Sequence, residues 1–424
     1  MTWALLKKWD DADKDALTFG EGVNLTEAFI ETDDGLLVPR SYRVSDTDFS
    51  TTLGSDIGSF EPINLREAQA PAVDAVMDHL TTNMSGGILF APCGTGKTVM
   101  GLEVLRRLGR RTLVLVHKSF LLDQWVERAS MFLPNAKVQI WQRDTLPDDD
   151  ADIVIGMVQS ITNVRREYPQ ELFDSFGTLI TDETHRYSAP LWQGAIVKFS
   201  ARYRLGLTAT PSRKDGLHHV FMAHIGAIIY ELHVERKPAK IWRVDTDVDF
   251  EPHSYRLYNG DVNTAKLITM ISQVDHRTEM ISAFAVRAVK SGRKVLILSE
   301  RVAHTKELQN QIQNLLPEDM TASLYIGGMK QEKLDKSSEA DVIIGTYAMA
   351  QEGLDIPALD TLILATPKTS ITQSVGRILR DSGEGKKDPV VVDIVDSRIE
   401  ILNAYWYSRR KKYLNLGYKF VRTR

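Results

Sequence analysis

The amino-acid sequence predicts an α/β fold made of two tandem parallel-sheet domains, preceded by a small accessory domain. Short, β-branched apolar runs alternate along the chain with longer segments of helical periodicity. This alternation is typical of βαβ units, whose parallel strands are buried on both faces. Two pairs of apolar runs also resemble each other in the same order, residues 111–116 with 293–298 and residues 151–156 with 340–345. The repetition indicates a duplicated α/β domain.

The domain boundaries are placed from this duplication and from local composition. The basic, proline-containing stretch at residues 235–240 is typical of a connector. In the acidic first segment, Asp33-Asp34-Gly35 lies between strand-like stretches and predicts a hairpin. This segment is small for independent folding, so we expect it to pack on the first α/β domain. The expected parts are an accessory domain, two α/β domains and a basic tail, over residues 1–62, 63–234, 235–402 and 403–424.

Composition favours a cytoplasmic protein. The 424 residues include a single cysteine, Cys93, so the chain alone can build neither a disulfide framework nor a cysteine-based zinc site. We find no secretion signal and no apolar run near the roughly 20 residues that span a bilayer, so we expect no membrane insertion.

Charge is unevenly distributed, although the net formal charge is only −4. Acidic residues concentrate in the first sixty residues, whereas residues 409–424 carry seven basic residues and no acid. Such a tail is either a solvated helix end or a contact with a phosphate backbone, and we expect the latter.

A glycine loop between a strand and a helix gives the sharpest local signal. Residues 88–90 are apolar, and leucines at helical spacing follow the loop. The loop glycines let backbone N–H groups approach phosphates, and the helix N-terminus adds the positive end of its dipole. We expect Lys97 to contact the β- and γ-phosphates and Thr98 to bind Mg²⁺, so ATP and Mg²⁺ are the predicted cofactors. The loop residues predicted to bind the nucleotide are Pro92, Cys93, Gly94, Thr95, Gly96, Lys97 and Thr98.

Two adjacent carboxylates follow another apolar run. The apolar residues 179–180 lead into Asp182 and Glu183, and open α/β sheets bind ligands at the carboxyl ends of their strands. We expect Asp182 to hold Mg²⁺ and Glu183 to orient and deprotonate the attacking water. His185 is either a residue that couples two sites or a structural hydrogen-bonding residue.

The second domain offers arginines that could complete such a site. Arg377 and Arg380 are three residues apart, which places them on one face of a helix that also carries Gln373. Phosphoryl transfer often uses an arginine from a second surface to neutralise developing charge. We therefore predict that Gln373, Arg377 and Arg380 are catalytic and that hydrolysis requires closure of the two domains.

The order of these motifs resembles that of superfamily 2 helicases, from about residue 63 to residue 381. The resemblance implies two RecA-like domains and an ATP-driven motor that acts on nucleic acid. Residues 65–69 resemble the adenine-reading element of the family, which implies nucleotide contacts from Arg66 and Gln69.

Two further motifs carry the same resemblance. Residues 207–211 resemble the motif that couples hydrolysis to DNA, which implies coupling roles for Thr208 and Thr210, and His185 of the Asp182–His185 motif is expected to share this role. Residues 345–357 resemble the fifth motif, which implies that Thr346 touches the nucleic-acid backbone and that Gly353 and Asp355 lie on the nucleotide side.

Three segments narrow the resemblance. Residues 121–125, 182–185 and 208–213 are most similar to XPB-type helicases and to phage UvsW- or D10-type DNA helicases. This narrower resemblance implies 3′ to 5′ polarity and action on forked or branched DNA, including branch migration or strand annealing in replication, recombination or repair.

Nucleic-acid contacts are expected at equivalent places in both domains, because the duplicated segments end in polar turns. Each of these residues could instead cap a helix or face solvent. Trp125 is expected to anchor its helix in the core. The predicted contacts are His117, Lys118, Gln159, Ser160, Ser299, Arg301 and Thr346.

The predicted function is that of an ATP-dependent DNA helicase or translocase, acting as a monomer on single-stranded, forked or branched DNA. Two alternatives stay open. One is an RNA helicase or the motor subunit of a restriction or remodelling complex, and the other is an ATP-switched DNA clamp or annealing module.

Overall fold

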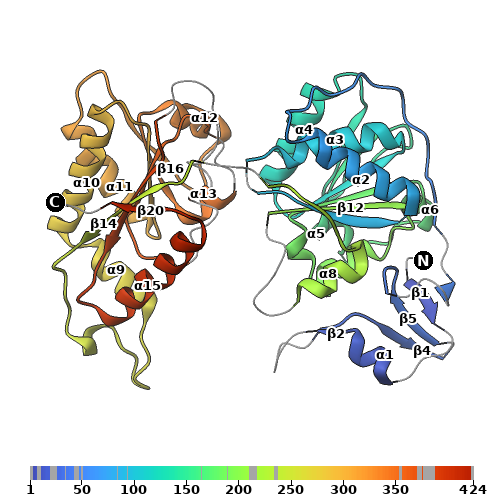
Figure 1. Ribbon diagram of the computed structural model, residues 1–424, viewed down its shortest axis with the longest axis horizontal. Helices are drawn as coiled ribbons and strands as arrows, with labels where there is room; N and C mark the ends of the chain where they lie inside the picture. Colours follow the sequence, from blue (N-terminus) through green and yellow to red (C-terminus); the bar gives the residue numbers. More distant parts are fainter. Residues whose placement is uncertain are drawn as a thin grey trace. The chain divides into compact units, whose positions relative to one another are not determined.

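A computed structural model gives the arrangement of most of the chain (Figure 1). The chain divides into two compact units, unit 1 from Met1 to Val234 and unit 2 from Glu235 to Arg424. None of the helices in the described ranges is long and apolar enough to span a membrane. The structure describes residues 3–6, 11–19, 26–33, 35–42, 47–48, 51–83, 85–92, 94–163, 165–188, 190–209, 217–233, 237–352, 356–369, 375 and 387–421.

The sheet of unit 1 has seven strands, in the order β13-β7-β12-β11-β8-β10-β9. Every neighbouring pair is parallel, so the carboxyl ends of all seven strands lie at one edge. The strands are β7 (Gly86–Phe90), β8 (Thr112–Val116), β9 (Val138–Trp141), β10 (Ile153–Met157), β11 (Thr178–Asp182), β12 (Tyr203–Thr208) and β13 (Ile228–Glu231).

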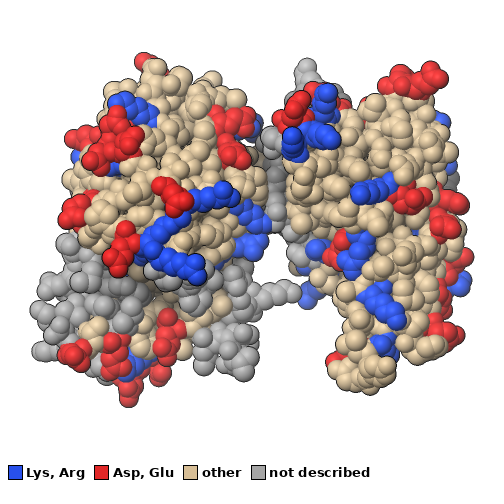
Figure 2. All heavy atoms as spheres, turned by 180° about the vertical axis from the view of Figure 1, so that it is seen from behind, with Lys and Arg blue, Asp and Glu red and all other residues tan. Residues whose placement is uncertain are grey.

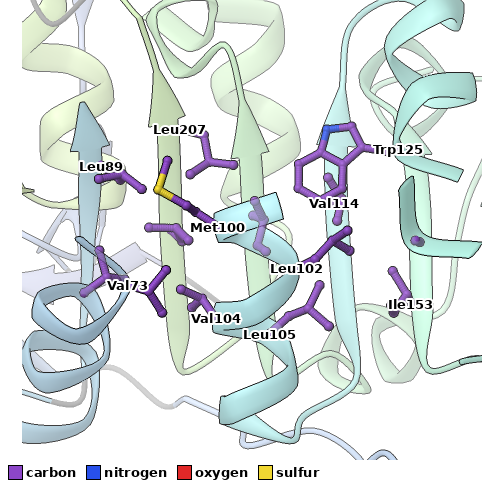
Figure 3. Close-up of a cluster of buried hydrophobic side chains, with 14 of the residues drawn as sticks. Val73, Leu89, Met100, Leu102, Val104, Leu105, Val114, Trp125, Ile153 and Leu207 are labelled. Carbon is purple, nitrogen blue, oxygen red and sulfur yellow. The ribbon is translucent and has the colours of Figure 1, made fainter. Parts of the chain in front are cut away.

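Helices cover both faces of this sheet, because alternate side chains of each strand point to opposite faces. In β8, Val114 and Val116 join one apolar cluster (Figure 3), whereas Leu113 and Leu115 join another. The first cluster packs under α2 (Ala70–Asn83), α3 (Lys97–Leu108) and α4 (Ser119–Phe132). The second packs under α5 (Val158–Ile161), α6 (Gln170–Asp174), η2 (Thr184–Ser188), α7 (Pro190–Ile196) and α8 (His218–Ile225).

The sheet of unit 2 also has seven parallel strands, in the order β16-β17-β15-β18-β19-β14-β20. They are β14 (Lys240–Asp245), β15 (Val295–Ser299), β16 (Ala322–Tyr325), β17 (Val342–Thr346), β18 (Thr361–Leu364), β19 (Val390–Val395) and β20 (Lys419–Val421). The helical elements of the unit are η3 (Pro252–Tyr255), α9 (Thr264–Ser272), α10 (Asp275–Lys290), α11 (Val302–Leu315), α12 (Gln331–Glu339), α13 (Tyr347–Glu352) and α15 (Glu400–Asn415).

The two sheets have the same strand order when one is read from the opposite end. β8 and β15 take equivalent places, as do β10 and β17, and these are the strands of the duplicated sequence segments. Each of the remaining five strands also has an equivalent in the other sheet. The predicted fold class of two tandem α/β domains is confirmed.

The C-terminal segment is part of unit 2, which corrects the prediction of a basic tail over residues 403–424. Strand β20 pairs in parallel with β14 and so completes the sheet. Arg409 of α15, predicted to face a phosphate backbone, is only 1% exposed and donates two hydrogen bonds of 2.8 Å to Asp393 of β19. A buried arginine needs such a charged partner. The partner could not be predicted from the sequence, because Asp393 lies in the middle of another strand.

The first segment forms a small antiparallel sheet in the order β4-β5-β1-β6. Thr32 of β4 (Ile30–Thr32) pairs with Gly35 of β5 (Gly35–Pro39), as the hairpin prediction requires. Arg40 then reaches the α/β part of unit 1 and donates to the carbonyl oxygens of Ala201 and Arg202 at 2.7 and 2.6 Å. The expected packing against the first α/β domain is confirmed. The other elements are β1 (Trp3–Leu6), α1 (Asp11–Ala16), β2 (Thr18–Phe19), β3 (Thr26–Glu27) and β6 (Thr47–Asp48).

A buried ion pair lies where the first strand of unit 2 ends. The N–H of Thr246 bonds the carbonyl of Val395 after β14, just as the N–H of Ala91 bonds the carbonyl of Thr208 after β7. In unit 2, the Thr246 hydroxyl donates to Asp396, which also accepts two hydrogen bonds from the fully buried Arg277. This position therefore holds an internal ion pair in unit 2 and the glycine loop in unit 1.

Candidate active site

The glycine loop joins β7 to α3 and leaves the start of that helix uncapped. Gly96 precedes α3 with φ of 85° and no side-chain cap, so the first N–H groups of the helix face out of the loop. A side chain at this position would be strained, and its Cβ would also lie 2.3 Å from Nε2 of Gln69. Unpaired N–H groups at a helix N-terminus form an anion site, which suits the predicted contact with phosphates.

Gln69 ties the segment before α2 to the glycine loop. It is 4% exposed, and its Oε1 accepts from the N–H of Arg66 at 2.9 Å. Its Nε2 donates to the carbonyl of Thr95 at 2.8 Å. Arg66 itself is exposed. The sequence did not indicate this link, and nucleotide contacts from Arg66 and Gln69 stay a prediction.

Asp182 lies at the carboxyl end of β11 with both carboxylate oxygens bonded. Its Oδ1 accepts from the N–H of Glu183, and its Oδ2 accepts from Nε1 of Trp125, each at 2.9 Å. Burial, together with the neighbouring charge of Glu183, raises the pKa of Asp182 to about 6, although Lys97 acts in the opposite direction. A cation beside this carboxylate would favour its ionised form.

Glu183 has a backbone conformation that is unusual for a residue with a side chain. Its φ is 50°, a left-handed value that costs on the order of 1–3 kcal/mol in a non-glycine residue. Its Oε1 lies 4.0 Å from Nζ of Lys97. Its Oε2 is buried and has no hydrogen-bond donor within the described part of the chain. A buried acceptor without a donor is rare, and it suits a group that binds a water molecule.

His185 and Thr208 join this site to the end of β12. Nδ1 of His185 lies 3.4 Å from Oε2 of Glu183 and 3.2 Å from the hydroxyl of Thr208. The hydroxyl of Thr184 meanwhile donates to the carbonyl of Leu207. The ends of β11 and β12 are therefore linked through side chains, and the coupling roles of His185 and Thr208 stay predictions.

The residues present fit ATP and Mg²⁺. The hydroxyl of Thr98 and the carboxylate of Asp182 are hard oxygen ligands, which Mg²⁺ prefers. Lys97 at the first turn of α3 offers a cation for the phosphates. Loop and carboxylates both lie at the carboxyl edge of one parallel sheet, where open α/β sheets bind ligands.

Several predicted site residues lie outside the described residues. One belongs to the glycine loop, one to the segment after β12, and the others to the fifth motif and the predicted arginine helix. They are Cys93, Thr210, Gly353, Asp355, Gln373, Arg377 and Arg380.

The predicted nucleic-acid contacts of unit 1 lie at the ends of β8 and β10. Gln159 is exposed, and its Nε2 donates to the carbonyl of His117 at 2.8 Å, which links the two turns. Lys118 is half-buried. His117 and Ser160 are 7% exposed, and the Ser160 hydroxyl accepts from the N–H of Arg143 at 2.8 Å. Both side chains are therefore largely buried, and contacts of His117 and Ser160 with nucleic acid stay predictions.

The equivalent turns of unit 2 behave similarly. Ser299 of β15 is fully buried, and its hydroxyl accepts from the N–H of Arg301 at 3.2 Å; its contact with nucleic acid stays a prediction. The guanidinium of Arg301 donates to Thr269 and to the carbonyl of Ala265, both in α9. Thr346 is half-buried and lies opposite Ser299 in the pairing of β15 with β17.

We expect His304 to make unit 2 less stable in mild acid. Burial, helped by the charge of Arg277, lowers the pKa of His304 to about 3. Its Nδ1 lies 3.0 Å from the hydroxyl of Ser299, and its Nε2 lies 3.4 Å from that of Thr278. The unfolded chain takes up this proton below pH of about 6.5, so stability should fall by about 1.4 kcal/mol per pH unit from there towards the folded pKa.

His304→Gln should flatten this pH dependence, because glutamine can form hydrogen bonds without titrating. Hydrogen exchange of peptides from β15 and α11, measured between pH 7.5 and 5.5, follows the local stability of unit 2. His276→Gln is the matched control, since His276 is an exposed histidine in the same unit. A slope in His304→Gln as steep as that of the wild type would contradict the prediction.

Comparisons with known proteins found a matching family model and several viral relatives. Residues 62–213 match the family model described as Type III restriction enzyme, res subunit. A "Putative ATP-dependent RNA helicase" of Acanthamoeba polyphaga mimivirus is 35% identical over 337 residues, covering 77% of this chain and 64% of that protein. A protein of the same name from African swine fever virus is 25% identical over 383 residues, covering 82% of this chain and 72% of that protein.

One solved structure shares the fold. Saccharomyces cerevisiae Dbp5 bound to RNA and ADP BeF3 aligns over 86% of this chain and 95% of that chain, with 13% identity and a TM-score of 0.56. This likeness concerns the fold alone. The chain spans 64% of the length of the mimivirus relative.

Proposed function

Because this chain belongs to the superfamily 2 helicases, we propose that it is an ATP-driven motor that moves along nucleic acid, and along DNA in particular. One observation carries the proposal. Within the described residues, Oε2 of the Glu183 carboxylate has no hydrogen-bond donor, and its Oε1 lies 4.0 Å from Nζ of Lys97 in the glycine loop. A proton acceptor next to a phosphate-binding loop is the arrangement that ATP hydrolysis requires.

Each residue of the site has a defined part in this proposal. The first N–H groups of α3 and Lys97 bind the phosphates, while Thr98 and Asp182 hold Mg²⁺, which neutralises phosphate charge when bound. Glu183 accepts the proton of the water whose oxygen attacks the γ-phosphorus, and ADP leaves as the bridging bond breaks. The contribution predicted for Gln373, Arg377 and Arg380 belongs to the same proposal.

Positive charge on unit 1 supports a nucleic-acid partner. Figure 2 shows a band of Lys and Arg side chains across one face of this unit. Arg143, whose N–H is bonded to Ser160 of α5, and Arg165, which follows α5, both have exposed side chains. Arg143 is bonded to the residue after the exposed Gln159, and Arg165 follows Gln159 by six residues. Cations at such a turn suit contacts with the phosphate backbone.

The choice of DNA rests on sequence resemblance. Residues 121–125, 182–185 and 208–213 are most similar to DNA helicases, as described above. RNA is the second candidate, because the mimivirus and African swine fever virus relatives are both named as RNA helicases. The 2′-hydroxyl is the group by which a protein tells the two apart.

We expect single-stranded or forked DNA to stimulate ATP hydrolysis more than RNA of the same sequence does. The measurement is steady-state ATPase activity with matched DNA and RNA oligonucleotides at fixed salt, because phosphate contacts are salt-dependent. Stronger stimulation by RNA would support the second candidate. No stimulation by either nucleic acid would contradict the proposed motor.

Strand displacement separates a helicase from an ATP-switched clamp. Partial duplexes with a 3′ or a 5′ single-stranded tail, together with forked and four-way DNA junctions, test unwinding and its direction. The proposed 3′ to 5′ helicase displaces strands from 3′-tailed duplexes. Stimulated ATP turnover without displacement of any substrate would favour a translocase, a clamp or an annealing module.

A further inference from the structure

Trp125 occupies a special place in the core of unit 1. It is fully buried and packs with the apolar side chains that lie between the sheet and α2 to α4. Figure 3 shows its indole above Val114 and Leu102, with the nitrogen on the side away from Leu105. A buried indole N–H normally finds an acceptor, and the acceptor of this N–H is a predicted site residue.

That acceptor is the predicted magnesium ligand. Nε1 of Trp125 donates to Oδ2 of Asp182 at 2.9 Å, while the other oxygen accepts from the N–H of Glu183. The two donors come from different elements, α4 and the turn after β11. They fix the rotation of the carboxylate and thereby the directions of its remaining lone pairs.

The indole ring also lies against the helix that follows the glycine loop. A Cβ added to Gly101 of α3 would be 2.9 Å from the Cη2 atom of Trp125, so only a glycine allows this close approach. Trp125 therefore touches both α3, which carries Lys97 and Thr98, and the carboxylate of Asp182. One side chain therefore contacts both elements that carry the predicted metal ligands, Thr98 and Asp182.

We propose that Trp125 is a positioning residue of the magnesium site, whose indole N–H holds Asp182 in the orientation that binds Mg²⁺ together with ATP. The proposal rests on the ATP site proposed above. Loss of the N–H leaves Oδ2 of Asp182 without its donor and frees the carboxylate to turn. Removing such a supporting hydrogen bond typically weakens metal binding by about 10–100-fold.

The same unit contains a matched control residue. Trp141 is also fully buried, and its indole N–H has no hydrogen-bond partner within the described residues. It packs among the rings of Tyr168, Phe173, Phe176 and Phe199, in the other apolar cluster. Trp141→Phe therefore removes an equally buried indole without removing a hydrogen bond.

The test measures nucleotide binding and needs neither hydrolysis nor nucleic acid. The Kd of a fluorescent, non-hydrolysable ATP analogue is determined by anisotropy, once in Mg²⁺ and once in EDTA. In Trp125→Phe, we expect about 10-fold or more of the affinity gained from Mg²⁺ to be lost, while the Kd in EDTA stays unchanged. Trp141→Phe should retain the full gain.

A second substitution separates the N–H from the shape of the ring. The amino acid β-(3-benzothienyl)alanine has sulfur in place of the indole N–H, and at position 125 it should reproduce the loss seen in Trp125→Phe while the melting temperature stays near that of the wild type. Full Mg²⁺ dependence in either Trp125 variant would overturn the proposal, as would an equal loss in Trp141→Phe. If the Kd of the wild-type protein for the analogue were the same in Mg²⁺ and in EDTA, the proposed ATP site would be overturned as well.

Discussion

Glu183→Gln should slow ATP hydrolysis by about 10²–10⁴-fold while leaving ATP binding intact. Glutamine has the shape of glutamate but cannot accept the proton of the attacking water. The 4.0 Å separation from Lys97 is too long for a hydrogen bond, so few contacts of the loop depend on this charge. Steady-state ATPase activity and the Kd of the fluorescent ATP analogue measure the two effects separately.

Glu171→Gln provides the control for this substitution. Glu171 lies in α6 of the same unit, and its side chain is exposed. Its substitution by glutamine removes the same charge as Glu183→Gln does, at a position remote in sequence from the glycine loop. It should retain wild-type turnover. Substantial hydrolysis in Glu183→Gln would assign the proton acceptor to another group.

Lys97→Ala should abolish both tight ATP binding and hydrolysis. The ammonium group lies in the first turn of α3, at the positive end of the helix dipole, where it adds the only full charge among residues 94–98. Its loss removes a donor to the phosphates, and removing one such preorganised donor typically costs about 10²–10³-fold in rate. Turnover at saturating ATP and the Kd of the analogue are the measurements.

Lys137→Ala is the corresponding control, because Lys137 is an exposed lysine of unit 1 paired with the exposed Asp150. The two active-site variants differ in a useful way. Glu183→Gln keeps nucleotide affinity, whereas Lys97→Ala loses it. A Lys97→Ala protein that binds the analogue as tightly as the wild type would contradict the role assigned to this lysine.

The strand pattern of the fold could be predicted because it depends on short-range chemistry. Apolar runs buried on both faces leave few alternatives to parallel strands, and the repetition of residues 111–116 and 151–156 indicated the second sheet. The C-terminal strand was missed for the opposite reason. The segment around Lys419 is short and mostly exposed, and its place is set by β14, nearly 180 residues earlier.

The polar contacts of the site could be predicted only in part. The glycine loop is one continuous segment after a strand, and Asp182 and Glu183 are adjacent residues at the end of another strand. The chemistry of each could therefore be predicted from the sequence. The bond between Trp125 and Asp182 joins residues 57 positions apart, and that between Gln69 and Thr95 joins residues 26 apart. Periodicity indicated that Trp125 faces the core, but it carries no information about which acceptor its N–H finds.

The burial of two predicted nucleic-acid contacts, Ser160 and Ser299, could not be predicted from the sequence. Ser160 follows a β-strand and Ser299 ends one, each in a polar turn. Both were therefore candidates for contacts with nucleic acid. Their hydroxyls instead accept from the N–H groups of Arg143 and Arg301. A small hydroxyl often serves the backbone near it, and sequence alone does not reveal whether it also reaches the surface.

The ion pair of Arg277 and Asp396 makes the two α/β units differ at the position where unit 1 has the glycine loop. Both side chains are fully buried, and removing either partner of such a pair typically costs about 3–5 kcal/mol, so a ligand cannot readily displace them. If the glycine loop of unit 1 binds phosphates as proposed, the equivalent position of unit 2 offers no second site, because this ion pair fills it.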